Sequence, residues 1–376
     1  MIQKVRRGLG SVAQVRDLME KLGMKKPLLV CGNTLAGVFY DKVMPEGECV
    51  RFGGYHANPA WEDCANALDL YREGGCDGII SLGGGSAMDT AKGIKALLLT
   101  GGDAEKASAC EFPEMKLPHI AVPASAGTGS EATQYAVLYF GGKKHTLTHP
   151  ALLPDGVVLD ASLLKTLPEQ HKKAAALDAL CQGIESYWAK AADEDSRVHA
   201  YLAITGVLDN VRAYLAGDEK AAEAMLEAAY HGGRAIQLTR TTAAHAMSYG
   251  IAAAFGIPHG HAVMLTMPWL WENMVNDENA LPILMDLASK MRQGSELMVP
   301  RLLSGIMIDL GMEAPPMPSC EVIDALAETV NPARLGNHPV PLDKAALRRI
   351  YRCAFLRKKG AERQACIDIW KYYGQK

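Results

Sequence analysis

The chain has 376 residues, which is long enough for two domains and a large hydrophobic core. Its formal net charge of -3 gives no electrostatic footprint for nucleic acid or for an anionic membrane, and we expect neither as a partner. The nine cysteines include no Cys-x-x-Cys pair, the charged N-terminus is not followed by an apolar run, and no segment approaches the length of a membrane span. These features predict a cytoplasmic protein with reduced thiols.

Short apolar runs alternate with helical patterns from residue 26 to about residue 160. Near-continuous apolar runs are typical of buried parallel strands. We expect strands at 27–31, 78–82, 119–123 and 157–160, helices at 61–71 and 88–99, and an antiparallel excursion at 135–139 and 144–147. This alternation predicts a doubly wound, Rossmann-like α/β domain over residues 1–169.

After Pro168 the pattern becomes helical and almost no strand signal remains. We expect helices at 170–192, 195–215, 219–240, 242–255, 260–275, 279–310, 321–329, 343–355 and 361–373, and one long loop at 332–341. The fold class predicted is therefore an α/β domain followed by an all-α domain at residues 170–376.

A glycine-rich turn follows the strand predicted at 78–82. Gly83, Gly84 and Gly85 precede Ser86 and a helical pattern, so that the backbone can approach a ligand at the positive end of a helix. A turn that only closes a βα unit would explain one glycine but hardly three. The turn therefore predicts a pyrophosphate site, and a second glycine-containing loop at 126–131 follows the next strand at the same edge of the sheet.

Three side chains of the helical half form a candidate metal site. His245 lies in one predicted helix, and the break at Pro258 starts a new helix near His259, so that a sharp turn can bring the two imidazoles together. Asp178 lies in a helix otherwise rich in Ala and Leu, where a buried carboxylate needs a charged partner. For the two histidines alone, satisfied core positions are an equal alternative, since their spacing fits no short zinc motif.

The spacing of these residues resembles that of the iron-containing (group III) alcohol dehydrogenase family. The usual family pattern, Asp-x3-His and then His-x3-His-x9-His, corresponds here to Asp178-x3-Gln182 and His245-x3-Tyr249-x9-His259. Gln182 and Tyr249 thus replace two histidines. Further matching segments at 58–59, 83–86 and 123–131 extend the resemblance over nearly the whole chain, and the segments at 241–245 and 257–263 are most similar to the phosphonoacetaldehyde reductase branch.

The resemblance implies a dehydroquinate synthase-like fold, a homodimer, and hydride transfer between NAD(P)H and a small aldehyde or alcohol. It implies one divalent metal, Fe²⁺ or Zn²⁺, held by Asp178, His245 and His259, with Gln182 as a candidate neutral oxygen ligand. An amide in place of an imidazole should weaken the binding of a late transition metal. It further implies three contacts to the dinucleotide, from Thr128, Ser130 and, at the nicotinamide end, Asp89.

The choice of cofactor is expected to depend on Gly32. Many NAD-preferring relatives carry an aspartate at this position, where it binds the ribose hydroxyl and repels a 2′-phosphate. Here the carboxylate is missing, and Asn33 and Thr34 can donate to phosphate. We therefore expect NADPH to be preferred over NADH, or accepted beside it.

Proton transfer and substrate recognition point to three further residues. Tyr249 and His261 are candidate proton donors, although His261 could equally be a residue at the start of a helix that lies at the surface or only supports the ligands of the site. Arg240, five residues before His245, is suited to a phosphonate or similar dianion, with pairing to a surface acid as the alternative. The substrate prediction is an anionic aldehyde such as phosphonoacetaldehyde. A broad alcohol dehydrogenase for small neutral alcohols or a sugar alcohol, and a metal-free nucleotide-binding relic, are the alternatives.

Overall fold

A six-stranded parallel sheet forms the centre of the N-terminal part of the computed structural model, which describes residues 3–113, 116–140 and 143–373. In the order β1-β8-β5-β4-β2-β3, the strands are β1 (Lys4–Arg7), β8 (Gly156–Leu159), β5 (His119–Pro123), β4 (Gly78–Gly83), β2 (Pro27–Cys31) and β3 (Val50–Phe52). The four strands expected from apolar runs are confirmed. They are the central four, and their residues are buried on both faces.

The two outer strands, β1 and β3, were not expected from the sequence. β1 contains three cationic residues, and β3 is only three residues long. Both are edge strands that pair on one side only, β1 with β8 and β3 with β2. An edge strand needs no continuous apolar run, so its sequence lacks the signal that identifies the central strands.

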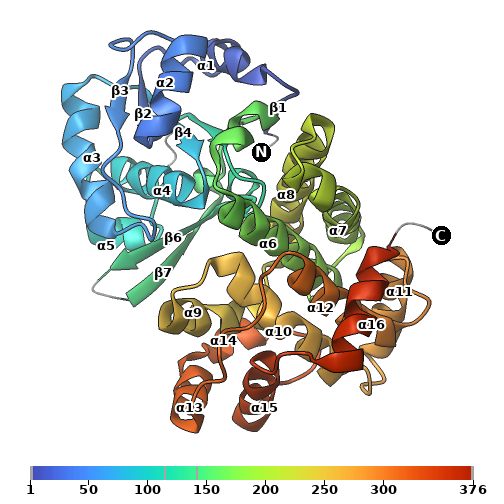
Figure 1. Cartoon of the computed structure of the whole chain (residues 1–376). Coiled ribbons are helices and arrows are strands. Elements are labelled where there is room, and N and C mark those ends of the chain that lie inside the picture. The colour runs from blue at the N-terminus through green and yellow to red at the C-terminus, as the bar shows by residue number, and fades with distance from the viewer. Residues whose placement is uncertain (1–2, 114–115, 141–142, 374–376) are drawn as a thin grey trace. The chain divides into compact units, whose positions relative to one another are not determined.

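A separate antiparallel pair, β6 (Tyr135–Phe140) and β7 (Lys143–Thr148), confirms the predicted excursion. The helices of this part are α1 (Val15–Leu22), α2 (Asn33–Lys42), α3 (Trp61–Glu73), α4 (Gly85–Leu99) and α5 (Ala104–Ser108) (Figure 1).

Two hydrophobic cores cover the two faces of the sheet. Leu29 of β2 packs in one core with α1 and α2, whereas its neighbours Leu28 and Val30 pack in the other with α3 and α4. Successive strand residues point to opposite faces, so this alternation shows a doubly wound sheet with helices on both sides. The helices that follow β2 and β4 lie on opposite faces, which makes the adjacent carboxyl ends of these two strands a topological switch point.

The chain clusters into two compact units, Met1–Pro168 with Gly217–Gly233 and Glu169–Ala216 with Arg234–Lys376. The segment 217–233 belongs to the first unit because its helix approaches a loop of that unit very closely. A Cβ atom at Gly233 would lie 2.2 Å from the backbone oxygen of Gly129. The assignment of nucleotide binding to residues 1–169 and of metal binding to 170–376 stays a prediction.

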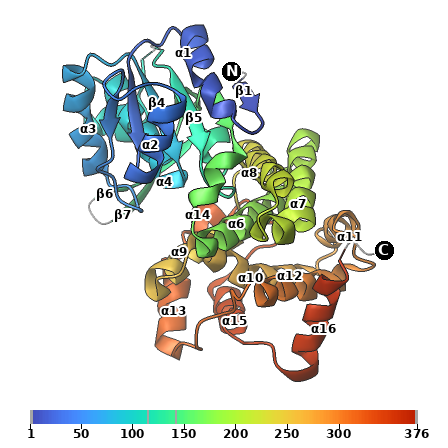
Figure 2. The same cartoon turned by 45° about the horizontal axis from the view of Figure 1, so that its top comes forward.

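Every strand of the described residues precedes Asp160, and the elements that follow it in the described part of the chain are helices (Figure 2). The helices are α6 (Glu169–Trp188), α7 (Glu194–Leu215), α8 (Glu219–Thr239), α9 (Ala243–Phe255), α10 (His259–Met274), α11 (Leu281–Lys290), α12 (Val299–Asp309), α13 (Cys320–Thr329), α14 (Pro332–Leu335), α15 (Lys344–Ala354) and α16 (Gly360–Lys371). No described helix is both long enough and apolar enough to cross a membrane.

Two predictions for the helical part are wrong in detail. The single helix expected at 279–310 is divided into α11 and α12, because Arg292 adopts a left-handed backbone with φ 54° and Ser295 then caps a short 3₁₀ helix, Glu296–Met298. The loop expected at 332–341 begins with the single helical turn α14, which Asn331 caps by accepting a hydrogen bond from the backbone N–H of Ala333.

Candidate functional site

The buried face of α6 carries three polar side chains one or two turns apart. Asp178, Gln182 and Glu185 have relative exposures of 3, 3 and 0%. Residues at intervals of four and three lie on one face of a helix. A helix that is otherwise apolar here thus directs two carboxylates and an amide into the interior of the helical unit, where each requires a polar or charged partner.

The partners come from α9 and α10, which are joined by the predicted break. Gly256 ends α9 with a left-handed backbone of φ 62°, and Pro258 immediately precedes the first residue of α10, His259. The turn reverses the chain, so that the rings of His245 and His259 come within 5.4 Å of each other. The expectation that a sharp turn brings the two imidazoles together is confirmed.

Asp178, His245 and His259 meet at one point. The Oδ1 atom of Asp178 lies 3.3 Å from Nε2 of His245 and 3.9 Å from Nε2 of His259. One ligand atom from each of the three residues lies within 4.8 Å of the other two. This Oδ1 is buried yet accepts no hydrogen bond from a described residue. One carboxylate oxygen and two imidazole nitrogens form a donor set that fits a divalent transition metal.

The close approach of α10 to α6 depends on Gly260. A Cβ atom at this position would lie 2.0 Å from the backbone oxygen of Ala174 and 2.8 Å from the backbone nitrogen of Asp178. Only a residue without a side chain permits this contact. Gly260 therefore fixes the distance between the helix that carries Asp178 and the helix turn that carries His259.

Glu185 is the most important residue of this site that the sequence reasoning missed. Its Oε2 atom accepts a hydrogen bond from Nδ1 of His245, and its Oε1 atom accepts bonds from the hydroxyl of Thr242 at 2.6 Å and the backbone N–H of Ala244 at 2.8 Å. The carboxylate thus caps the N-terminus of α9 and orients the His245 ring. The three-residue interval from Gln182 to Glu185 on an apolar helix was the available signal.

These contacts determine the charge of the site. Burial opposes the negative charge of Asp178, but the imidazoles of His245 and His259 close to it hold its pKa below the usual value. Burial likewise lowers the pKa of His245, but the carboxylates of Glu185 and Asp178 outweigh it and raise that pKa to about 9. Gln182 donates a hydrogen bond to Asp178, which also lowers the aspartate pKa. The site is therefore built around cationic charge, whether a proton or a metal ion supplies it.

Tyr249 lies against the same cluster. Its ring stacks on that of His259 with a centroid distance of 5.6 Å and an interplanar angle of 6°. The Nη1 atom of Arg334 in α14 donates a hydrogen bond to the Tyr249 hydroxyl at 3.1 Å, and the guanidinium lies 5.2 Å from the centre of that ring. Arg334 is a second site residue that the sequence reasoning missed, because it comes from the segment expected to be a loop.

His261 and Arg240 are placed differently. His261 is 5% exposed and burial lowers its pKa, so the surface alternative considered for it is wrong. Arg240 is exposed, has a left-handed backbone with φ 64°, and forms no ion pair with a described residue, so the alternative of pairing with a surface acid is not observed. The roles of both residues in catalysis or substrate binding remain predictions.

The first unit contains the predicted nucleotide residues at the switch point of its sheet. Gly83, Gly84 and Gly85 connect β4 directly to α4, and a Cβ atom at Gly85 would lie 2.9 Å from the Thr128 side chain. The glycine turn and the loop that contains Thr128 are therefore in contact. Ser86, also predicted, donates a hydrogen bond to the backbone oxygen of Ala57.

Asp89 and Ser130 are joined in the structure. The Ser130 hydroxyl donates to Oδ1 of Asp89 at 2.8 Å. The ammonium of Lys92, which the sequence reasoning did not consider, donates to the backbone oxygens of Ser130 at 2.7 Å and Tyr135 at 2.6 Å. Burial lowers the pKa of Lys92 to about 8. These bonds hold the second glycine-containing loop against α4, the helix that begins at the glycine turn predicted to bind pyrophosphate.

The third part of the predicted nucleotide site, which the sequence assigns to cofactor selection, lies at the end of β2. Gly32 is the residue before α2, and Asn33 and Thr34 form its first turn. A Cβ atom at Gly32 would have only the Tyr55 hydroxyl within 4 Å, at 3.9 Å, so the position has room for a side chain.

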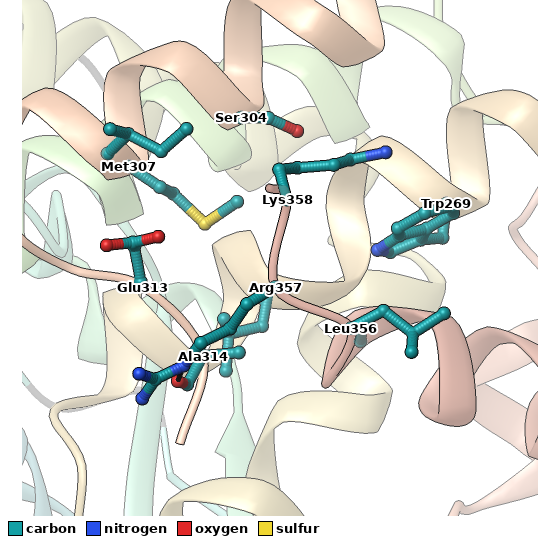
Figure 3. A pocket seen from close by; sticks show the side chains of 11 residues that line it. Trp269, Ser304, Met307, Glu313, Ala314, Leu356, Arg357 and Lys358 are labelled. Atoms are coloured by element: carbon teal, nitrogen blue, oxygen red, sulfur yellow. Dashed lines mark hydrogen bonds between the residues drawn. The ribbon is translucent and has the colours of Figure 1, made fainter. Parts of the chain in front are cut away.

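A separate pocket of about 40 Å³ lies in the helical unit (Figure 3). Trp269, Glu313, Arg357 and Lys358 are among its lining residues, and the Lys358 ammonium lies 4.5 Å from the centre of the Trp269 ring. Such a volume holds a few water molecules rather than a substrate. Asp178, His245 and His259 do not line it, so it is not part of the candidate metal site.

Comparison with known proteins gives one consistent result. Residues 3–161 match the family model for iron-containing alcohol dehydrogenase, and residues 173–302 match the C-terminal model of the same family. The chain is 36% identical over 269 residues to the Escherichia coli K12 protein named "Probable alcohol dehydrogenase EutG", an alignment that covers 70% of this chain and 68% of that protein.

Two further similarities concern aldehyde reductases. The chain is 36% identical over 228 residues to a phosphonoacetaldehyde reductase of Streptomyces viridochromogenes, covering 56% of this chain and 57% of that protein. Its structure is similar to that of a sulfoacetaldehyde reductase of Bifidobacterium kashiwanohense in complex with NAD⁺, with a TM-score of 0.84, 25% identity, and coverage of 93% and 96% of the two chains.

Proposed function

Because this chain belongs to the iron-containing alcohol dehydrogenase family, we propose that it reduces a small anionic aldehyde with NADPH at a metal ion held by Asp178, His245 and His259. The observation that carries the proposal is the convergence of these three side chains around the buried Oδ1 of Asp178, which accepts no hydrogen bond from a described residue. Intact ligands at family spacing argue against a metal-free nucleotide-binding relic.

The proposed reaction needs a polarised carbonyl, oriented metal ligands and a proton donor. A divalent metal, when bound, polarises the aldehyde carbonyl and stabilises the negative charge that develops on oxygen during hydride transfer. Glu185 holds Nδ1 of His245 and so directs Nε2 toward Asp178. Tyr249, whose hydroxyl accepts a hydrogen bond from Arg334, is our candidate for the proton donor, with His261 as the alternative. Gln182 lies beside Asp178 and is proposed as a neutral fourth ligand, so the site should hold iron or zinc less tightly than one with three imidazoles.

Two cations support an anionic substrate. Arg334 places positive charge against Tyr249, whose ring in turn stacks on His259. Arg240 lies exposed two residues before Thr242, just ahead of α9. Two relatives are named as reductases of phosphonoacetaldehyde and sulfoacetaldehyde, aldehydes whose anionic group is attached to the carbon next to the carbonyl. Such a substrate fits a site with its carbonyl at the metal and its anionic group at a nearby guanidinium.

A substrate panel tests the proposal. Phosphonoacetaldehyde, sulfoacetaldehyde, acetaldehyde and butyraldehyde are assayed with NADPH and with NADH, beside metal analysis of the purified protein. We expect kcat/KM for an anionic aldehyde to exceed that for the neutral ones, and the loss of a bidentate contact to lower it roughly ten- to a hundredfold.

The variants Arg240→Ala and Arg334→Ala then identify the cation. The one that binds the anionic group should lose the preference, measured as the ratio of kcat/KM for the anionic and the neutral aldehyde. Arg240→Ala should leave activity on butyraldehyde near that of the wild type, whereas Arg334→Ala also removes the hydrogen bond to Tyr249 and is judged by that ratio alone. Equal efficiency of the wild type on anionic and neutral aldehydes would end the anionic proposal and favour a broad dehydrogenase for small neutral alcohols or a sugar alcohol.

A further inference from the structure

At the carboxyl end of β2, where a nucleotide-binding sheet commonly carries an acid, the guanidinium of an arginine from the neighbouring strand β3 is found instead. Arg51 lies on β3 beside Leu29 of β2, and its Nη2 atom donates a hydrogen bond to Oδ1 of Asn33, the first residue of α2. The guanidinium therefore leaves its own strand and reaches across the end of the neighbouring one.

The path of the Arg51 side chain is defined by Gly53. A Cβ atom at Gly53 would lie 2.7 Å from Nη2 of Arg51 and 3.0 Å from the backbone oxygen of Cys31. The absence of a side chain at Gly53 thus leaves room for the guanidinium to lie over the last residue of β2. The positive charge also reaches Cys31, whose pKa burial raises to about 11 and Arg51 partly lowers.

No carboxylate of the described residues forms an ion pair with this cation. Among residues 3–113, 116–140 and 143–373, the structure contains no ion pair of Arg51. Gly32, the residue that precedes Asn33, supplies no acid either. An arginine without an acidic partner, fixed beside the N-terminus of a ten-residue helix, forms a local site for an anion.

The position of this cation identifies the anion. β2 and β4 are neighbours, and the pyrophosphate candidate Gly83–Gly85 follows β4 directly. In doubly wound sheets a dinucleotide lies across the switch point, so its adenosine ribose reaches the end of the strand adjacent to the glycine turn. An acid there binds the ribose 2′-hydroxyl of NAD, whereas an arginine accommodates the 2′-phosphate of NADP.

We infer that Arg51, together with Asn33 and Thr34, binds the 2′-phosphate of NADPH and sets the preference of this enzyme for that cofactor. The inference rests on the proposed function, because it takes the glycine turn as the pyrophosphate site. Arg51 acts here as a binding residue, and it has no part in hydride transfer.

Binding measurements test the inference without turnover. Dissociation constants of NADPH, NADH, 2′,5′-ADP and 5′-AMP are measured by calorimetry for the wild type and for Arg51→Ala, Arg51→Lys and Gly32→Asp. A matched control is Arg72→Ala, since Arg72 is an exposed arginine that donates to the backbone oxygen of Gly101 in the same unit.

We expect the wild type to bind NADPH and 2′,5′-ADP more tightly than NADH and 5′-AMP. Arg51→Ala should weaken the two 2′-phosphorylated ligands by roughly ten- to a hundredfold, as expected for a lost bond to a charged group, and leave NADH within about twofold. Arg51→Lys should lie between these values, because it keeps the charge but not the planar fork. Gly32→Asp should shift preference toward NADH, and Arg72→Ala should change nothing.

Unchanged affinity for 2′,5′-ADP in Arg51→Ala, or an equal loss for NADPH and NADH, overturns the inference. Retained NADH binding shows that the variant is folded. A wild type that binds NADPH through Arg51 but reduces no aldehyde would refute the proposed function and leave this inference standing.

Discussion

Replacing Glu185 by glutamine should weaken metal binding, although the substitution exchanges one side-chain oxygen for an NH2 group in a residue outside the proposed ligand set. The Oε2 atom of Glu185 accepts a hydrogen bond from the N–H of His245 Nδ1, which leaves the Nε2 lone pair directed toward Asp178. In the variant, the amide nitrogen that replaces this oxygen is a donor. It favours the tautomer with the proton on Nε2, and that nitrogen can then no longer bind a metal.

The magnitude follows from the contacts that the substitution keeps. The Oε1 atom of Glu185 caps α9 through Thr242 and Ala244, and the amide oxygen of glutamine can still accept these bonds. The helix cap is therefore retained, and the main loss is at His245. Removing such a supporting hydrogen bond typically lowers metal affinity about 10- to 100-fold, or roughly 1.4–2.7 kcal/mol.

Competition of the protein with a chelator for Zn²⁺ or Fe²⁺ gives the affinity, and thermal unfolding with and without metal gives an independent measure, since a ligand that binds only the folded state raises Tm. Glu321→Gln, an exposed glutamate in the first turn of α13, is the matched control and should behave as the wild type. A folded Glu185→Gln protein with metal affinity within about threefold of the wild type would refute this reasoning.

Three further predictions concern the ligands, the helix contact and pH. His259→Ala should abolish metal retention and turnover, whereas Gln182→Ala should only weaken metal binding; full metal content in the purified His259 variant would contradict the ligand assignment. Gly260→Ala places a Cβ atom 2.0 Å from the Ala174 oxygen, so we expect a loss of roughly 1–3 kcal/mol in unfolding free energy, measured with denaturant, and an unchanged midpoint would show that α10 can move. Burial raises the pKa of Glu131 from 4.5 to about 7, so the folded state binds this proton more tightly than the unfolded state. The wild type should therefore lose up to about 3 kcal/mol of stability as pH rises through that window. The Glu131→Gln variant should show no such loss when its Tm is compared at pH 5 and pH 8. The same change of Tm with pH in the variant and the wild type would contradict this prediction.

The sequence by itself determined the central strands, most of the helices and the convergence of His245 and His259. A parallel strand covered on both faces must be apolar at successive positions, so 27–31, 78–82 and 119–123 are visible without any partner. The turn between α9 and α10 is likewise local, because Gly256 and Pro258 stop one helix and start the next.

The tertiary structure decided which polar groups meet. The sequence shows Glu185 on a largely apolar helix, but only the packing of α6 against the start of α9 makes it the partner of His245. Arg51 and Asn33 are brought together by strand pairing across 18 positions of sequence. A periodic pattern records whether a residue is buried, which is a property of its own element. The identity of its partner depends on the approach of two elements distant in sequence, and no local pattern records that distance.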